Sequence, residues 1–95
     1  IEQPDVRKVY SLSGGKAEIS ILTIPENAAC VDMTISSIAN AEDFPDQLLI
    51  AGKFDYEADE FKIPHGNTKL EPLDQVFLVG PADEITQAAN FLTAE

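Results

Sequence analysis

Residues 63–80 read IPHGNTKLEPLDQVFLVG, and this stretch decides the fold. Pro64 disfavours a helical conformation in the residue before it and keeps that residue extended. A Gly-Asn pair at residues 66–67 supplies the positive φ angles that a tight turn needs. A second turn at residues 72–74 precedes an unbroken apolar run at residues 76–79. Because such a short run, rich in β-branched and aromatic residues, is typical of a strand covered on both faces, we predict a central strand here.

The sequence on either side predicts a small α+β domain. Strand 17–24 carries little charge, so we expect both of its faces to be covered. Helix 28–40 is short, with Asp32 or Thr34 as its N-cap. Gly52, inside a strand, indicates a bulge or the close approach of another backbone or of a ligand. The elements are predicted in the order strand 17–24, helix 28–40, strand 47–54, strand 61–63, strand 75–79 and helix 82–93.

The predicted sheet is a small mixed sheet of four to five strands with two helices, in the order β-α-β-β-β-α. A crossover through the first helix makes the first two core strands parallel. The last helix has an apolar stripe at Ile85, Ala88, Ala89 and Leu92. Residues 1–15 are a linker or an N-terminal strand, and residues 16–95 are the domain. The chain begins without Met, so we expect it to be part of a longer protein.

The composition is strongly acidic, with 6 Lys and Arg against 17 Asp and Glu and a formal net charge of −11. Such a surface repels phosphate backbones and anionic membranes, which argues against nucleic-acid binding. No apolar run approaches the roughly 20 residues of a membrane span, so we expect no direct membrane insertion. The single cysteine allows neither an intramolecular disulfide nor a cysteine cage for a metal, and it suits a reducing compartment.

Two patterns resemble functional loops without meeting their requirements. The Gly-Gly-Lys at residues 14–16 lacks the earlier Gly and the following Ser or Thr of a phosphate loop, so a hairpin turn is favoured. Asp55, Glu57 and Asp59 alternate like the first three ligands of a calcium loop, but the sixth position is Glu instead of Gly. An ordinary acidic hairpin is favoured there, with a weak divalent-cation site as the alternative.

No set of residues indicates catalysis. His65 is the only histidine, and it has no second histidine or cysteine with which to build a metal site or a nucleophile pair. An exposed turn histidine is slightly favoured over a ligand contact. Cys30 is predicted to be a buried core residue, since no neighbouring base indicates activation. We therefore predict a protein without enzymatic activity.

The stretch at residues 63–80 resembles a known family. An Ile-Pro strand end, a Gly-Asn-Thr turn, and an Asp-initiated strand that ends in Gly before a short helix are similar to the C-terminal half of a TrkA-C domain. This domain is the C-lobe of the family that regulates conductance of potassium (RCK). The resemblance covers about residues 16–93. One departure is visible: Leu73-Asp74 stands where the family has Gly-Asp, so the turn must be built without a glycine.

The resemblance implies a regulatory domain at the cytoplasmic face of the inner membrane, attached to a potassium channel or another cation transport protein. It implies a homodimer, with cyclic di-AMP or another nucleotide as a candidate ligand at the dimer interface. Lys53 would supply the positive charge that an Arg gives in the family, but without its bidentate fork. The ligand-binding positions implied are Ile50, Ala51, Gly52, Lys53, Ile63, Pro64 and His65.

Two other function classes remain open at this stage. A pure dimerisation or assembly module would use the same dimer surface without a small-molecule ligand. An enzyme fragment is the more remote alternative, since the carboxylates are spread over loops and helix starts, where solubility and capping explain them.

Overall fold

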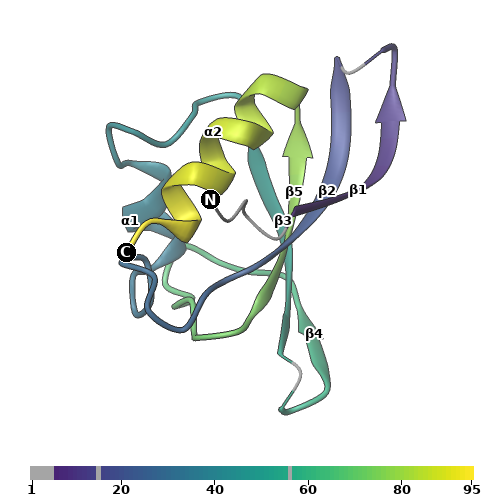
Figure 1. The fold of residues 1–95 in the computed structure, drawn as a ribbon. Coiled ribbons are helices and arrows are strands. Elements are labelled where there is room, and N and C mark those ends of the chain that lie inside the picture. Colours follow the sequence, from purple (N-terminus) through teal and green to yellow (C-terminus); the bar gives the residue numbers. More distant parts are fainter. Residues whose placement is uncertain (1–5, 15, 56) are drawn as a thin grey trace.

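The computed structural model describes residues 6–14, 16–55 and 57–95, and these form five strands and two helices (Figure 1). The predicted α+β class is confirmed. The expected linker at residues 1–5 lies outside the described residues. Along the chain the elements are β1 (Val6–Leu12), β2 (Ala17–Thr23), α1 (Ile35–Ala39), β3 (Leu49–Asp55), β4 (Glu60–Lys62), β5 (Gln75–Gly80) and α2 (Ala82–Thr93).

The strands form one sheet in the order β1-β2-β5-β3-β4, and every neighbouring pair is antiparallel. β5 is therefore the central strand, as its apolar run predicted. β2 and β3 run in the same direction, which is what a crossover through α1 requires. They are not hydrogen-bonded to each other, because β5 inserts between them in the opposite direction. For this reason the sheet is antiparallel throughout and not mixed.

The segment that the sequence left open as a linker or a strand forms β1, an edge strand paired with β2. Ser13 and Gly14 between them have φ angles of 53° and 67°, as in a tight hairpin turn. The glycine-lysine pattern is therefore part of a β-hairpin and not a phosphate loop that opens a helix. The division of the chain between residues 15 and 16 stays a prediction.

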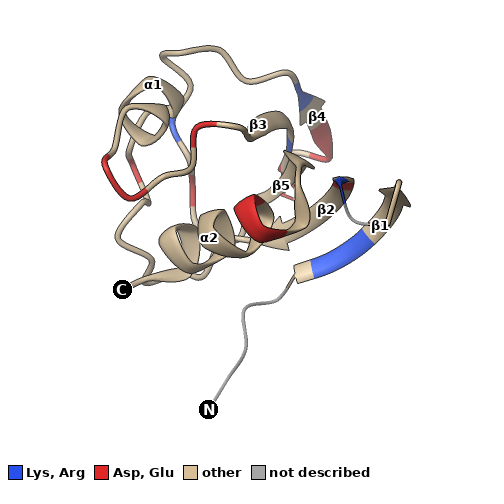
Figure 2. Ribbon diagram, turned by 90° about the horizontal axis from the view of Figure 1, so that it is seen from above, with Lys and Arg blue, Asp and Glu red and all other residues tan. Residues whose placement is uncertain are grey.

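The hydrophobic core lies between the helices and one face of the sheet. α2 contacts β2 and β5, and its predicted stripe of Ile85, Ala88, Ala89 and Leu92 is buried. Figure 2 shows α1 and α2 on the same side of the strands. The core also contains Leu22, Ile24, Ala28, Cys30, Ile38, Phe44, Ile50, Leu70, Val76 and Leu78.

The opposite face of the sheet, which we call the open face, has no helix of the described chain over it (Figure 1). Its side chains alternate with the core residues along each strand, and those in the centre of the sheet are only half-buried. Within the described chain, helices therefore cover β2 and β5 on one face only. The central residues of the open face are Ile19, Ile21, Phe77 and Val79.

Helix α1 is much shorter than the predicted helix at residues 28–40. Asp32 has a φ of 72°, which a right-handed helix cannot accommodate. The backbone before α1 instead pairs with the loop at Leu70, because the Asp32 N–H donates to the Leu70 carbonyl and the Leu70 N–H donates to the Met33 carbonyl. Thr34, one of the two predicted N-caps, begins the helix, and its hydroxyl accepts from the Ser37 N–H.

Gly52 marks the predicted bulge, and the group that approaches it closely is an aromatic side chain. The register between β3 and β5 shifts between Ile50 and Gly52, so the strand is bulged there. A Cβ atom on Gly52 would lie 2.5 Å from Cζ of Phe61, so only glycine leaves room for this ring. Phe61 packs edge-on against Phe77 with ring centroids 5.5 Å apart. The missing side chain thus lets an aromatic pair form on the open face.

The turn before β5 is strained. Leu73, which stands where the family pattern has glycine, has a φ of 68° and is 52% exposed. A Cβ atom in this left-handed region costs roughly 1–2 kcal/mol. The conformation is held by two backbone bonds: the Leu73 N–H donates to the Ile24 carbonyl, and the Ile24 N–H donates to the Asp74 carbonyl, each at 2.8 Å. The end of β2 therefore imposes the turn on a residue that does not favour it.

We expect Leu73→Gly to be more stable than Leu73→Ala by about 1 kcal/mol, as measured by urea unfolding. Both variants lose the same exposed side chain beyond Cβ, but only glycine relieves the strain at positive φ. The entropy that glycine gains in the unfolded state offsets part of the relief. Equal stability of the two variants would show that the turn is not strained.

Cys30 is buried, and its Sγ donates to the Leu92 carbonyl at 3.2 Å, which connects the loop before α1 to the end of α2. Burial raises the pKa of the thiol from 9.0 to about 11. A backbone hydrogen bond lowers this pKa, but its effect is smaller than that of burial. The prediction of an inert core cysteine agrees with this environment. The thiolate, which is the reactive form, is therefore strongly disfavoured in the folded chain at neutral pH.

The raised pKa predicts a loss of stability in alkaline solution. The unfolded thiol releases its proton near pH 9.0 and the folded one near pH 11, so the folded state binds more protons between these values. The free energy of unfolding should fall across this window by roughly 2 kcal/mol through Cys30, at about 1.4 kcal/mol per pH unit. Urea unfolding of the wild type and of Cys30→Ala at pH 8 to 11 measures the difference, and parallel pH profiles would contradict it.

Candidate functional site

Three of the seven predicted ligand positions form an accessible corner after β4. Ile63 and His65 are exposed and Pro64 is half-buried. The turn that follows is fixed on α1, because the Gly66 carbonyl accepts from the Ser36 N–H and the Thr68 carbonyl accepts from the Ile35 N–H, both at 2.9 Å. The sequence favoured an exposed turn histidine, and this is where His65 lies.

The turn is also stabilised by hydrogen bonds between its own residues. The His65 N–H donates to the Thr68 hydroxyl at 2.9 Å, and the Thr68 N–H donates to the His65 carbonyl at 3.0 Å. The backbone polar groups next to His65 are therefore used within the turn, while the imidazole projects from a fixed support. A side chain presented in this way contacts a ligand without having to order a loop first.

The β3 positions are less accessible. Ile50 is 8% exposed in the core beneath the helices, and Gly52 is buried under the Phe61 ring. Ala51, at the bulge, is half-buried. The register pairs Lys53 with Lys62, so Ile63 lies one residue beyond the last pair and beside Gly52. The structure thus brings the two predicted segments together, with β3 behind the exposed corner.

Lys53 has a different role from the one the family resemblance implied. Its side chain is 5% exposed, and Nζ lies 2.9 Å from the Asp74 carboxylate, which is 2% exposed. Nζ also donates to the Lys69 carbonyl at 2.9 Å. Its charge is therefore neutralised inside the protein, where a buried ammonium needs a partner. A phosphate at the surface cannot use this charge unless the ion pair with Asp74 breaks.

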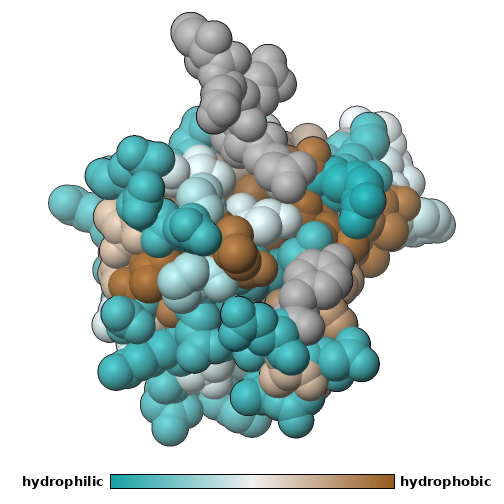
Figure 3. Space-filling model, turned by 60° about the horizontal axis from the view of Figure 1, so that its bottom comes forward, coloured by the Kyte–Doolittle hydropathy of each residue, from teal (hydrophilic) through white to brown (hydrophobic). Residues whose placement is uncertain are grey.

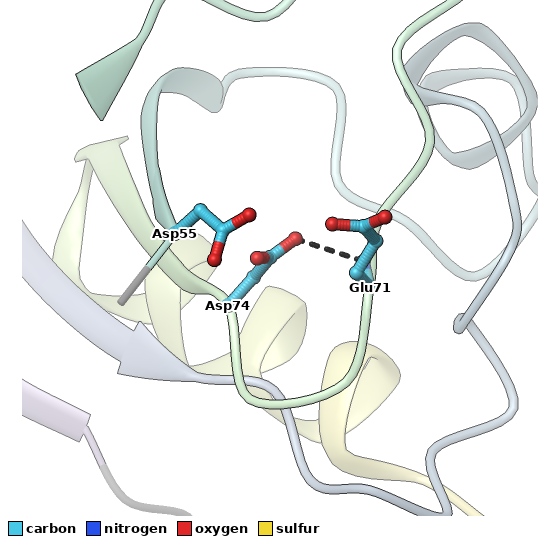
Figure 4. A group of neighbouring side chains, drawn as sticks. All are labelled: Asp55, Glu71 and Asp74. Carbon is cyan, nitrogen blue, oxygen red and sulfur yellow. Dashed lines mark hydrogen bonds between the residues drawn. The ribbon is translucent and has the colours of Figure 1, made fainter. Parts of the chain in front are cut away.

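Asp55, Glu71 and Asp74 gather their carboxylate oxygens within 4.8 Å of one another (Figure 4). Asp74 also accepts from the Glu71 N–H at 2.8 Å, the bond drawn as a dashed line. The cluster lies in a cavity of about 430 Å³ that is lined by further carboxylates from Glu26, Asp32 and Glu57. This concentration of negative charge is relieved by Lys53, whose Nζ is also 3.9 Å from Glu71.

The calcium-loop pattern is not reproduced by this cluster. Of the three alternating acids, only Asp55 joins it, and its carboxylate accepts from the N–H groups of Glu57 and Ala58 as in an ordinary turn. The structure therefore agrees with the predicted acidic hairpin. A divalent cation would meet three carboxylate ligands here, but the Lys53 ammonium already occupies the position next to the most buried of them.

A comparison with protein-family models matches residues 19–93 of the chain to the TrkA-C domain. The chain belongs to this family. The match runs from β2 to the last residue of α2, and β1 lies before it. TrkA-C domains are regulatory domains of potassium and other cation transport systems and are not a catalytic family. Within the described residues, no helix is long and apolar enough to cross a membrane.

Sequence reasoning missed the buried ion pair at the centre of this TrkA-C domain. The signal was present, because Lys53 is a single cation inside the apolar strand segment LLIAGKF. A charge at such a position needs a buried partner. The identity of that partner, 21 positions further along the chain, depends on the pairing of β3 with β5 and could not be read from local pattern.

We expect Lys53→Met to lower the free energy of unfolding by about 3 kcal/mol or more in urea titrations. The substitution keeps an apolar stem but leaves Asp74 as a buried carboxylate without its cation. Lys62→Met is the matched control: its ion pair with Glu60, at 3.8 Å, is more than half exposed, so its loss should cost less than about 1 kcal/mol. Lys53→Met as stable as Lys62→Met would contradict the importance of the buried pair.

Proposed function

We propose that this TrkA-C domain is a ligand-binding and dimerisation domain of a potassium or other cation transport protein in the cytoplasm. The observation that carries the proposal is the exposed Ile63-Pro64-His65 corner, which is held rigidly on α1 and lies beside the bulge of β3. A preorganised apolar and imidazole surface on a regulatory domain is suited to contact a small molecule.

The chemistry of the corner favours a ligand with a flat, partly apolar part. Ile63 and Pro64 offer apolar contacts, and the His65 ring can stack on a base or donate a hydrogen bond. An anionic ligand such as cyclic di-AMP or another nucleotide would find the nearby charge on the exposed Lys62, since Lys53 is paired inside. The net charge of −11 opposes such a ligand at long range, so these close contacts have to provide its affinity.

Regulation follows from linkage. A ligand bound between two copies stabilises one geometry of the dimer, and it biases the transport protein only by the difference between its affinities for the competing geometries. The His65 turn and α1 are joined by backbone hydrogen bonds, so a ligand that moves the corner also moves the beginning of α1.

The second candidate is a dimerisation or assembly module without a small-molecule ligand. The favouring observation is that the open face of the sheet is apolar and unoccupied by any helix of the described chain. Both candidate functions require a dimer. They differ in whether the Ile63-Pro64-His65 corner binds a small-molecule ligand.

A thermal-unfolding screen against cyclic di-AMP, ATP, NADH, Ca²⁺ and K⁺ separates these candidates. A ligand at about 100 times its Kd adds about 2.7 kcal/mol, which corresponds to a Tm increase of roughly 10–20 °C for a domain of this size. His65→Ala and Ile63→Ala should remove most of the shift. Asn90→Ala, an exposed change on α2, is the control and should keep it. A dimer that no compound stabilises would favour the assembly module.

A further inference from the structure

The open face of the sheet is an almost uncharged surface. The register pairs place side chains from four neighbouring strands on this face, and large apolar side chains occur on each of these strands. Among the described strand residues, Arg7, opposite Ile21, is the one charged residue that shares this face. The face is lined by Tyr10, Ile19, Ile21, Leu49, Phe77 and Val79.

Several of these side chains are exposed to an extent that is unusual for their type. Leu49 on β3 is 61% exposed and Tyr10 on the edge strand β1 is 55% exposed. Phe61, on the opposite edge strand β4, is 54% exposed and shares this face through its register partner Phe54. Figure 3 shows hydrophobic surface in brown in patches at the left, in the centre and at the right of the view, between hydrophilic surface in teal. Contiguous exposed apolar surface of this kind marks an interaction site.

The amino-acid pattern of the central strands points in the same direction. A sheet that faces water on one side alternates apolar and polar residues, whereas β5 reads Val-Phe-Leu-Val without interruption and β2 has Ile19 and Ile21 on its outer face. Such strands have the composition of a sheet covered on both faces. This chain covers one face with its helices, and the other face still has the composition of a buried layer.

The distribution of charge indicates which partner can cover the open face. The chain carries a net charge of −11, so two copies repel each other wherever their carboxylates meet. The acidic residues of the described chain lie in loops, at the beginning of α2 and on strand segments, which are red in Figure 2. The strand acids, Glu18, Asp55 and Glu60, alternate in register with the open-face residues. No described strand residue on the open face is acidic. Two acidic copies can therefore approach each other most closely through this face.

The open face is large enough for a specific protein–protein interface. Three strands have seven residues, β5 has six and β4 has three. At about 4.8 Å between strands and roughly 3.3 Å per residue, they cover roughly 500 Å². Two such faces bury about 1,000 Å² in total, which is at the lower end of specific interfaces. The sheets would stack about 10 Å apart, as in a β-sandwich. A two-fold axis through the centre would bring the Phe77 and Ile21 regions of both copies together.

We propose that the open face binds a second copy of this chain, so that two sheets stack face to face in a two-fold dimer. The proposal rests on the dimerisation part of the proposed function and identifies the surface that performs it. It leaves the Ile63-Pro64-His65 corner at the margin of the interface, because Ile63 follows directly on β4, the edge strand next to β3.

Matched leucine-to-glutamate substitutions test the surface. Leu49→Glu and Leu12→Glu each place a carboxylate on the open face, at opposite sides of the sheet. Leu73→Glu adds the same charge at a comparably exposed leucine in the turn before β5, which is not part of a strand and lines the acidic cavity around Asp55 and Asp74. All three positions are at least half exposed, so the variants should fold, which circular dichroism verifies. The dimer dissociation constant is measured by sedimentation equilibrium over a dilution series.

The wild type and Leu73→Glu should sediment with twice the 10.3 kDa of one chain, while Leu49→Glu and Leu12→Glu should raise the dissociation constant at least tenfold. A dimer that both open-face variants leave unchanged would overturn the proposed surface, although dimerisation itself would stand. A wild type that stays monomeric at every concentration would overturn the dimer together with its surface. In that case a ligand-dependent Tm shift would still support the regulatory binding role.

Discussion

The buried ion pair between Lys53 and Asp74 is the constraint on which the rest of this structure depends. Its two side chains come from β3 and from the residue directly before β5, and the pair lies inside the protein at 2.9 Å. Asp74 also accepts from the Glu71 N–H, and Lys53 also donates to the Lys69 carbonyl. The pair therefore fixes the loop between the candidate ligand corner and the central strand. A movement of this loop that separates the pair would leave a buried charge without its partner, at a cost of about 3–5 kcal/mol.

The same constraint explains the strain at Leu73. The Asp74 carboxylate has to reach Lys53 while the Asp74 carbonyl accepts from Ile24 at the end of β2. Both contacts can be made together when the residue before Asp74 adopts positive φ, and in this chain that residue is a leucine. The departure from the family's Gly-Asp pattern leaves the geometry in place and adds a local cost, which the surrounding hydrogen bonds and the ion pair offset.

The domain has two unequal faces, and this asymmetry connects the fold to its proposed role. One face of the sheet is buried by α2 and the loops around α1, and the other presents apolar strands that the described chain leaves uncovered. The bulge at Gly52 and the Phe61–Phe77 contact belong to the uncovered face, close to the Ile63-Pro64-His65 corner. A partner on the sheet and a ligand at the corner would therefore act on neighbouring residues, as a domain that couples assembly to ligand binding requires.

Local sequence patterns determined much of this architecture. The apolar run at residues 76–79 indicated the central strand, the stripe from Ile85 to Leu92 indicated α2, and Gly52 indicated the bulge, because each signal depends on neighbouring residues only. The tertiary structure alone decided the rest. The helix predicted at residues 28–40 has only five residues, because the segment before it pairs with the loop at Leu70. Lys53 is a buried cation, because the strand order places it next to Asp74. Side-chain patterns record which faces are apolar, whereas the partner of a buried charge depends on contacts between segments far apart in the chain.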